Sequence, residues 1–445
     1  MRLSRLATSL LLGTLFLLWI VSNAAVLSSA KLVALREPGI QLTGLLAIGS
    51  ACAGAMLSLR SRLSERFFGG LDKLYRSHRA FGIAALMFAL THWTLIQAPG
   101  WFGSGDAAGA HRGHRAASAI SGLQKLLQSQ RGLATSFGNW GFYALIGLVL
   151  IALVSRIPYR AFYLTHRLIP AVLILLAFHS LVLFNFALWL TPVGIVLGFL
   201  LAGGVASALI SLAGRIGARR KATGVVTNLK YYPELRVLQS ELEMSKDWPG
   251  HAAGQFAFVH GGSWEGQHPF TIASAWNPAD RKVTFVTKEL GDFTSTLSER
   301  AKIGAAAQVE GPYGAFTFKD DCPMQIWIAG GVGITPFIAR LRQRQSEPGV
   351  DGHEVHLFYT SESDHEEGIG RLSELAEGAG VTFTFLHTPR HGFLTGERVR
   401  AEAPEWQRAS IWFCGPAAFG EAIKRDFAAH GMKRSRFHQE IFAWR

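Results

Sequence analysis

Six apolar stretches in the first half of the chain limit its fold more than any other feature of the sequence. A bilayer core of about 30 Å is crossed by about 20 apolar residues in a helix. The stretches lie at 6–27, 40–59, 79–97, 139–155, 166–187 and 191–214. We therefore predict a membrane α-helical bundle of six transmembrane helices. The first stretch follows the basic segment MRLSR and also resembles a signal peptide, but its length of about 22 apolar residues favours retention as a helix.

Positive charge accompanies these stretches. Residues 1–220 contain 20 Lys and Arg against 4 Asp and Glu, whereas residues 221–445 contain 24 against 27. The early cations lie in connections between apolar stretches, as in cytoplasmic loops of membrane proteins and unlike a nucleic-acid-binding face. If the helices alternate, most cations lie on one side and the long 98–138 connection lies opposite. We expect an integral protein of a bacterial-type inner or plasma membrane, with membrane lipid but no nucleic acid as partner, and a cytoplasmic second half.

Four histidines lie in the third and fifth apolar stretches. His78 and His92 are fourteen residues apart, and His166 and His179 are thirteen apart. Ionisable residues inside membrane helices are costly and usually functional. Because the two helices run in the same direction, we predict one haem held by His78 and His166 on the cytoplasmic side and a second held by His92 and His179. Thirteen residues of ideal helix rotate by about 220°, so His166 and His179 share a face only if Pro170 alters the helix.

The second half changes to short β-like runs and then to alternating strands and helices. The runs VVTNL, RVLQSELE, QFAFVH, KVTFVT and AAAQVE predict a small antiparallel β-barrel. The later alternation predicts an α/β domain with an open parallel sheet. We therefore expect a membrane domain over 1–215, a barrel domain over 216–320 and a nucleotide-binding α/β domain over 321–445. Three cysteines are too few for a disulfide framework, in keeping with a reducing compartment.

Five short motifs carry the chemistry of this half. They are HPFTIAS at 268–274, GDFT at 291–294, GPYG at 311–314, AGGVGITP at 329–336 and CGP at 414–416. The glycine-rich AGGVGITP turn follows a predicted buried strand and precedes a helix, where backbone N–H groups can approach a phosphate closely. CGP ends another predicted strand of the same sheet, which is the edge where ligands bind in this architecture.

In this order the motifs resemble the flavin- and nicotinamide-binding module of the ferredoxin–NADP reductase superfamily. With the six-helix domain and its paired histidines, the chain is similar to the NADPH oxidase / ferric reductase family over essentially its full length. The resemblance implies FAD, two b-type haems and NAD(P)H as cofactors. It also implies that the FAD is held by the barrel domain and NAD(P)H by the α/β domain.

The resemblance further assigns roles to single residues. Contacts to the flavin are implied for His268, Pro269, Phe270 and Thr271. Contacts near the FAD phosphates are implied for Ser274, Lys288, Gly291 and Thr294, although many relatives have Arg in place of Lys288. The dinucleotide would be received by Gly330, Gly331, Gly333, Thr335 and Pro336. Cys414 and Gly415 would lie beside the nicotinamide, and Phe442 would cover the flavin, so Cys414 and Phe442 are the residues expected nearest the reacting atoms.

The family implies one order of electron transfer. A hydride passes from NAD(P)H to the flavin, which releases single electrons to the inner haem, then the outer haem, then an external acceptor. We expect an NAD(P)H-dependent transmembrane oxidoreductase that reduces ferric iron or another metal. Reduction of O2 to superoxide and electron donation to a periplasmic protein partner are open alternatives. The four histidines disfavour a fourth reading, a haem-free anchor for a cytoplasmic flavin reductase.

The choice of dinucleotide depends on the segment after the second strand of the nucleotide domain. Proteins specific for a 2′-phosphate place Arg or Lys there. Here the segment reads YTSESDHEEGIGR, with no cation before Arg371. Acidic and hydroxyl side chains between Ser361 and Asp364 can instead contact a ribose hydroxyl. We therefore expect weak discrimination, with NADH used at least as well as NADPH.

Overall fold

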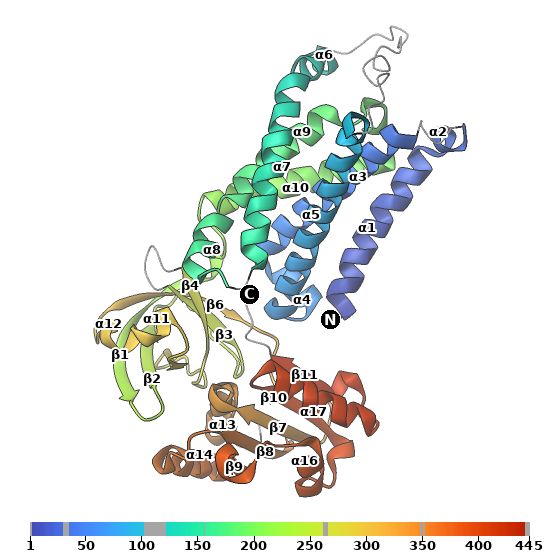
Figure 1. Cartoon of the computed structure of the whole chain (residues 1–445). Helices are drawn as coiled ribbons and strands as arrows, with labels where there is room; N and C mark the ends of the chain where they lie inside the picture. Colours follow the sequence, from blue (N-terminus) through green and yellow to red (C-terminus); the bar gives the residue numbers. More distant parts are fainter. Residues whose placement is uncertain are drawn as a thin grey trace. The chain divides into compact units, whose positions relative to one another are not determined.

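The computed structural model describes residues 2–29, 35–101, 122–154, 156–260, 266–347, 349 and 352–440. The chain forms two compact units that divide between Ile216 and Gly217. The first unit is helical, and the second contains two β-sheets with helices beside them (Figure 1). Residues 102–121 of the predicted 98–138 connection, together with Phe442, lie outside the described residues.

The first unit is built mainly from long apolar helices. α3 packs against α5 and α10, and α7 packs against α9. Arg36, at the start of α3, ties this helix to the end of α5, because its guanidinium donates to the carbonyls of Leu95 and Ile96 at 3.0 Å each. The helices are α1 (Arg2–Ser22), α2 (Ala24–Ser29), α3 (Arg36–Ser58), α4 (Arg62–Phe68), α5 (Leu71–Trp101), α6 (Gly122–Ser129), α7 (Arg131–Leu153), α8 (Tyr159–His166), α9 (Ile169–Leu183) and α10 (Pro192–Leu212).

Five segments of the described chain are long and apolar enough to cross a membrane. They are Arg36–Ser58, Leu71–Ala98, Arg131–Leu153, Arg160–Leu183 and Pro192–Leu212. The prediction of six long membrane helices is thus confirmed for five. The first predicted stretch yields a shorter apolar helix, Leu6–Ser22.

The first helix, α1, ends at Ser22, and a turn at Asn23 separates it from α2. The side-chain amide of Asn23 donates to the carbonyl of Trp19 at 2.9 Å, and the backbone N–H of Asn23 uses the same carbonyl at 3.1 Å. Such local side-chain bonds compete with continuation of a helix. Leu15 and Trp19 are nevertheless 0% and 3% exposed, so one face of α1 is part of the core of the unit.

The fifth predicted helix is two helices. α8 ends at His166 and α9 begins at Ile169, with Pro170 in its first turn. Proline has no N–H to donate to the carbonyl four residues earlier, which belongs to His166, and its ring crowds that carbonyl. His166 and His179 therefore belong to two different helices, so the rotation of one ideal helix does not apply between them.

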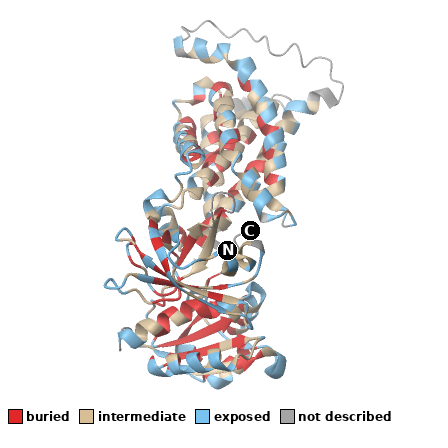
Figure 2. Cartoon of the chain, turned by 90° about the vertical axis from the view of Figure 1, so that its left-hand side faces the viewer, coloured by how far each residue is buried: buried red, intermediate tan, exposed pale blue. Residues whose placement is uncertain are grey.

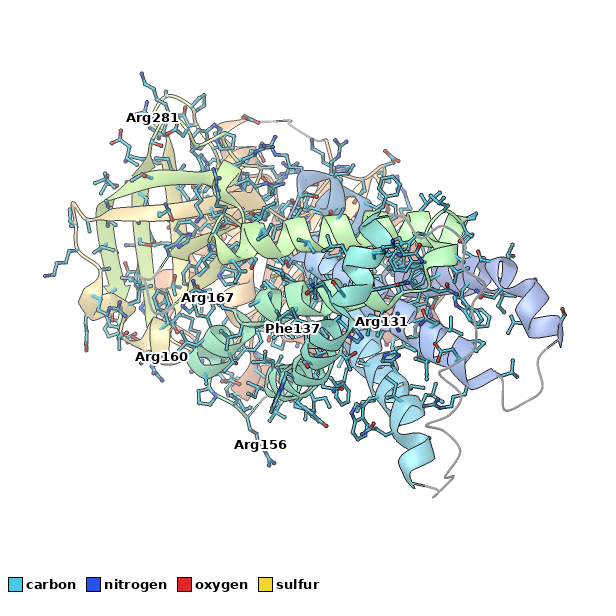
Figure 3. All side chains as sticks on the ribbon, turned by 90° about the horizontal axis from the view of Figure 1, so that it is seen from above. Arg131, Phe137, Arg156, Arg160, Arg167 and Arg281 are labelled. Atoms are coloured by element: carbon cyan, nitrogen blue, oxygen red, sulfur yellow. The ribbon has the colours of Figure 1, made fainter. Side chains whose placement is uncertain are left out.

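Cations lie at both ends of α7. Arg131 begins the helix, whereas Arg156 follows its end and Arg160 and Arg167 lie in and just after α8, as Figure 3 labels them. A helix of this length rises about 34 Å, so Arg131 and Arg156 are separated by roughly the thickness of a bilayer core. Arg131 belongs to the 98–138 connection, which is expected to lie opposite most cations.

The second unit begins with a six-stranded antiparallel sheet of order β4-β3-β6-β1-β2-β5. A bridge between Ile272 and Phe285 joins the β4 side to β5 and so closes the sheet toward a barrel. Val283, Phe285 and Val309 are among its buried side chains, and Figure 2 shows buried residues along the strands of this unit. The strands are β1 (Lys221–Tyr232), β2 (Val237–Met244), β3 (Phe256–His260), β4 (Gln267–Thr271), β5 (Lys282–Lys288) and β6 (Ala306–Tyr313).

A five-stranded parallel sheet of order β11-β10-β7-β8-β9 follows. Its first strand, β7, has β8 on one side and β10 on the other, so the strand order reverses at β7. The predicted alternation of strands and helices is confirmed. The elements are β7 (Met324–Gly330), α13 (Thr335–Ser346), β8 (Glu354–Ser361), α14 (Glu366–Gly378), β9 (Thr382–His387), α15 (Thr388–His391), α16 (Gly396–Glu402), β10 (Ala409–Cys414), α17 (Ala417–Ala429) and β11 (Phe437–Glu440).

Close packing of α3 on α10 predicts a stability difference between two glycines. A Cβ added at Gly204 of α10 would lie 2.7 Å from Cβ and 3.0 Å from Cα of Cys52, whereas one at Gly147 of α7 would meet no described atom within 4 Å. Gly204→Ala should therefore destabilise the folded protein by about 1–3 kcal/mol through overpacking. Gly147→Ala should be neutral or slightly stabilising, because Ala favours a helix. Thermal unfolding in detergent checks this; equal midpoints for the two variants would contradict it.

Candidate functional site

The structure brings the four predicted membrane histidines together in two pairs. The rings of His78 on α5 and His166 on α8 have centroids 6.0 Å apart, and those of His92 on α5 and His179 on α9 have centroids 6.4 Å apart. These are the same pairs that the sequence predicts. Two metal–nitrogen bonds of about 2.0–2.1 Å, together with the two ring radii, span a little over 6 Å. A metal bound by both rings of a pair therefore fits this spacing.

Hydrogen bonds fix the orientation of three of these rings. The Nδ1 atoms of His78, His92 and His179 lie 2.8, 2.9 and 2.9 Å from the backbone carbonyls of Gly54, Ile40 and Ala134. A carbonyl oxygen only accepts, so each Nδ1 carries the proton and each Nε2 keeps its lone pair. This is the arrangement of metal-binding histidines, whose second nitrogen donates to a carbonyl. The Nδ1 of His166 has no hydrogen-bond partner within the described residues.

A cavity lies beside the His92–His179 pair. Its empty space, the open mouth included, is about 920 Å³, and its wall combines the two rings with Gly44, Gly138 and apolar side chains. A Cβ at Gly44 would lie 3.0 Å from the His92 ring, and one at Gly138 would overlap the His179 ring. Glycine at these positions gives the rings room, so the residues present fit a haem at the outer pair.

No described group of three or more His, Cys, Asp or Glu side chains is placed to hold one metal ion. Each histidine pair offers two nitrogen ligands, the number that an axial haem site takes. Arg76, two residues before His78 in α5, forms an ion pair with Asp72 at 2.6 Å. The guanidinium of Arg167 lies over the ring of Tyr163 at 5.6 Å.

The HPFT motif forms strand β4, where alternate side chains point to opposite sides. On one side, the ring of Phe293 from GDFT stacks on His268 with centroids 3.8 Å apart and lies 6.3 Å from Phe270. On the other, the Gln267 amide donates to the buried carboxylate of Glu310 at 2.9 Å. The sequence analysis selected neither Phe293 nor Glu310. Phe293 is the one aromatic residue within GDFT and could have been found there, but no local pattern marks Glu310.

Glu310 belongs to a buried polar group behind β4. Tyr313 donates its hydroxyl to Glu310 at 2.6 Å, and the guanidinium of Arg220 lies 4.4 Å from the centre of the Tyr313 ring. A fully buried carboxylate with these donors holds β4 and β6 in one arrangement. This network fixes the strand that carries His268 and Phe270.

Two predicted phosphate-binding groups are engaged inside the protein. The Thr294 hydroxyl accepts from the N–H of Gly291 at 3.1 Å and donates to its carbonyl at 3.1 Å. Ser274 is 7% exposed, and its hydroxyl accepts from the N–H of Thr284 at 3.1 Å. Ser274 also packs against His251, whose pKa is lowered to about 4 by burial. These hydroxyls stabilise the barrel, whereas Lys288 ends β5 with an exposed side chain.

The glycine-rich turn and CGP meet at the carboxyl ends of β7 and β10. Cys414 is paired with Ala329 across the two strands. A Cβ at Gly333 would overlap the carbonyl of Cys414, and one at Gly415 would lie 3.1 Å from the nitrogen of Gly330. Gly331 differs from these glycines, because its φ is +55° and a Cβ there would meet no described atom within 4 Å. The two motifs thus form one edge at the point where the strand order reverses, the usual ligand position in such sheets.

Cys414 itself is part of the core. Its side chain is 0% exposed, and burial, with a smaller effect of Glu440, raises the pKa of its thiol well above the ordinary value. The thiol is therefore neutral near pH 7 and is not a nucleophile. Thr335 and Pro336 are also buried, and the Thr335 hydroxyl donates to the carbonyl of Val332 at 2.8 Å, which holds the glycine-rich turn.

Two family models match separate parts of the chain. Residues 43–177 match the family model of the ferric reductase like transmembrane component, and residues 225–317 match a model of an FAD-binding domain. The toluate 1,2-dioxygenase electron transfer component of Pseudomonas putida is 28% identical over 174 residues, which are 37% of this chain and 51% of that protein. A flavohemoprotein of Burkholderia sp. (strain TH2) is 26% identical over 216 residues, 45% of this chain and 52% of that protein.

The chain spans about half the length of these curated relatives. Among solved structures, the ferredoxin reductase in carbazole 1,9a-dioxygenase aligns with a TM-score of 0.41 and 22% identity, covering 50% of this chain and 69% of that one. The chain thus joins a segment similar to the ferric reductase like transmembrane component to a segment similar to an FAD-binding domain.

Proposed function

We propose that the protein carries electrons from NAD(P)H, through FAD and two b-type haems, across the membrane to an external acceptor, ferric iron or another chelated metal. The observation that carries this proposal is the pairing of four histidines, with ring centroids 6.0 and 6.4 Å apart, in a chain that also contains an FAD-binding domain. The matched family description favours a metal as acceptor. We also infer that α1 crosses the bilayer with the five longer spans, because it shares their core.

Each part of the chain has a separate task in this proposal. When bound, FAD turns the two-electron chemistry of a nicotinamide into one-electron chemistry, and haems conduct single electrons. His78 and His166 would hold the inner haem, and His92 and His179 the outer one. The carbonyl partners of three rings keep Nε2 unprotonated and make it a better ligand.

The second unit would bind both FAD and NAD(P)H. The strand of His268, Pro269, Phe270 and Thr271 offers an aromatic surface, with Phe293 beside it, to an isoalloxazine ring. Lys288 supplies an exposed positive charge for a phosphate. Gly331 leaves open space at the end of β7 for a dinucleotide phosphate, with Gly330 and Gly333 behind it. Cys414 and Gly415 shape the nicotinamide end, and the neutral thiol of Cys414 takes no part as acid or base.

Haem content tests the histidine pairs. The protein with full cofactor should contain two haems per FAD, and His92→Leu or His179→Leu should lose the outer haem, because each removes one of its two ligands. Reduction of a soluble dye by NADH should continue, since the FAD-binding domain is unchanged, whereas reduction of an external acceptor should be lost. Pyridine haemochrome assays and anaerobic stopped-flow measure both. His430→Leu, in the second unit, is the control. Full haem content in His92→Leu would contradict the proposal.

Two glycines of one turn should respond differently to a side chain. Gly331→Val places a β-branched residue at φ +55° in open space, so it should weaken NAD(P)H binding and slow flavin reduction about tenfold or more, with both haems retained. Gly333→Ala instead clashes with the Cys414 carbonyl and should lower the thermal midpoint. Stopped-flow flavin reduction and thermal unfolding separate the effects. An unchanged rate in Gly331→Val would exclude this edge as the dinucleotide site.

The acceptor is tested with the protein in sealed vesicles, its flavin domain outside and the acceptor enclosed. We expect NADH to drive reduction of enclosed ferric citrate, detected by a ferrous chelator, faster than it drives superoxide formation in an aerobic sample. His179→Leu should abolish both signals if they pass through the outer haem. A superoxide rate that matches NADH consumption, with no ferrous iron formed, would instead establish the oxidase alternative.

A further inference from the structure

Two loops meet beyond the carboxyl ends of β8 and β9. Residues 362–365 follow β8, the second strand of the parallel sheet, and α15 (Thr388–His391) follows β9, the next strand outward. In open α/β folds the loop after the second strand contacts the 2′ position of the adenosine ribose. The side chains at this position therefore contact the one group in which NADH and NADPH differ.

Tertiary structure brings a cation to this position. Arg390 of α15 forms an ion pair with Asp364, with 2.8 Å between its guanidinium nitrogen and Oδ2. From the sequence, no cation was expected before Arg371, and Arg371 is paired with Glu367 within α14. The segment by itself does not reveal Arg390, because Arg390 lies 26 residues further along the chain than Asp364 and reaches it through the neighbouring strand.

The loops are held together independently of this ion pair. His387, at the end of β9, lies 3.0 Å through Nε2 from the carbonyl of Glu362, and the hydroxyls of Thr360 and Thr388 are 2.9 Å apart. Asp364 and Arg390 keep 46% and 69% of their side-chain surface exposed. Exposed ion pairs contribute little to stability, so a ligand can break this one at small cost.

We propose that Asp364 and Arg390 together set the choice between NADH and NADPH, an inference that rests on the proposed NAD(P)H-dependent function. Arg390 attracts a 2′-phosphate through charge-assisted hydrogen bonds. Asp364 repels that phosphate, neutralises Arg390 in its absence and accepts a hydrogen bond from a free 2′-hydroxyl. The two effects oppose each other, so the wild-type protein discriminates weakly between the dinucleotides.

The opposition predicts opposite effects of two substitutions that break the same ion pair. Asp364→Asn should raise the ratio of kcat/KM for NADPH to that for NADH about tenfold, because it removes the repulsion and releases Arg390. Arg390→Gln should lower the ratio by a similar factor, and Arg390→Lys should restore part of it. When Asp364→Asn is added to Arg390→Gln, it should raise this ratio by a smaller factor than it does in the wild-type protein. If the ion pair only stabilised the fold, both single substitutions would change the ratio in the same direction.

The measurement uses the full-length protein with its cofactors and a soluble dye as acceptor. Glu367→Gln, which breaks the neighbouring ion pair of α14, is the matched control and should leave the ratio unchanged. Calorimetric binding of 2′,5′-ADP and of 5′-ADP is measured in parallel on the same variants, because it does not depend on electron transfer. If neither dinucleotide reduces the flavin, the proposed function fails, whereas the ratio of the two ADP affinities still tests this inference. Shifts in the same direction, or no shift in either single variant, overturn it.

Discussion

The low polarity of a membrane core is the constraint on which the first unit depends, because a buried imidazole needs a partner for each of its nitrogens. Helix α3 supplies the carbonyls of Gly54 and Ile40 for both histidines of α5, and α7 supplies that of Ala134 for His179. With Nδ1 satisfied in this way, the remaining nitrogen needs a metal or another donor. The packing of α3 and α7 against the histidine helices therefore also determines which imidazole nitrogens are left to bind a metal.

Glycine makes this packing possible. Gly44 and Gly138 lie against the rings of His92 and His179, where any side chain would meet the imidazole. The same residues line the cavity beside the outer pair, so the space for a cofactor and the approach of the ring come from the same missing Cβ atoms. At Gly204 the missing Cβ atom serves helix packing alone, because the neighbouring residue is Cys52.

The second unit uses close backbone contact in a different way. Reversal of strand order at β7 puts the ends of β7 and β10 side by side, and Gly333 and Gly415 let the two turns touch. The thiol of Cys414 at this edge is neutral at physiological pH, since burial keeps it protonated. Such an edge suits recognition of a dinucleotide and transfer of a hydride, which require orientation and no side-chain acid or base.

Local features of the sequence determined the apolar spans, the barrel strands, the alternating α/β pattern and the motifs, because each depends on residues close together in the chain. The spacing of the histidines predicted their pairing. Only the folded chain showed that His166 and His179 lie on two helices, α8 and α9, which are separated just before Pro170. The turn at Asn23, which separates α1 from α2, involves a local bond that hydropathy does not detect. Glu310 behind β4 and Arg390 beside Asp364 came from tertiary structure alone, since residues distant in sequence meet only when strands are paired.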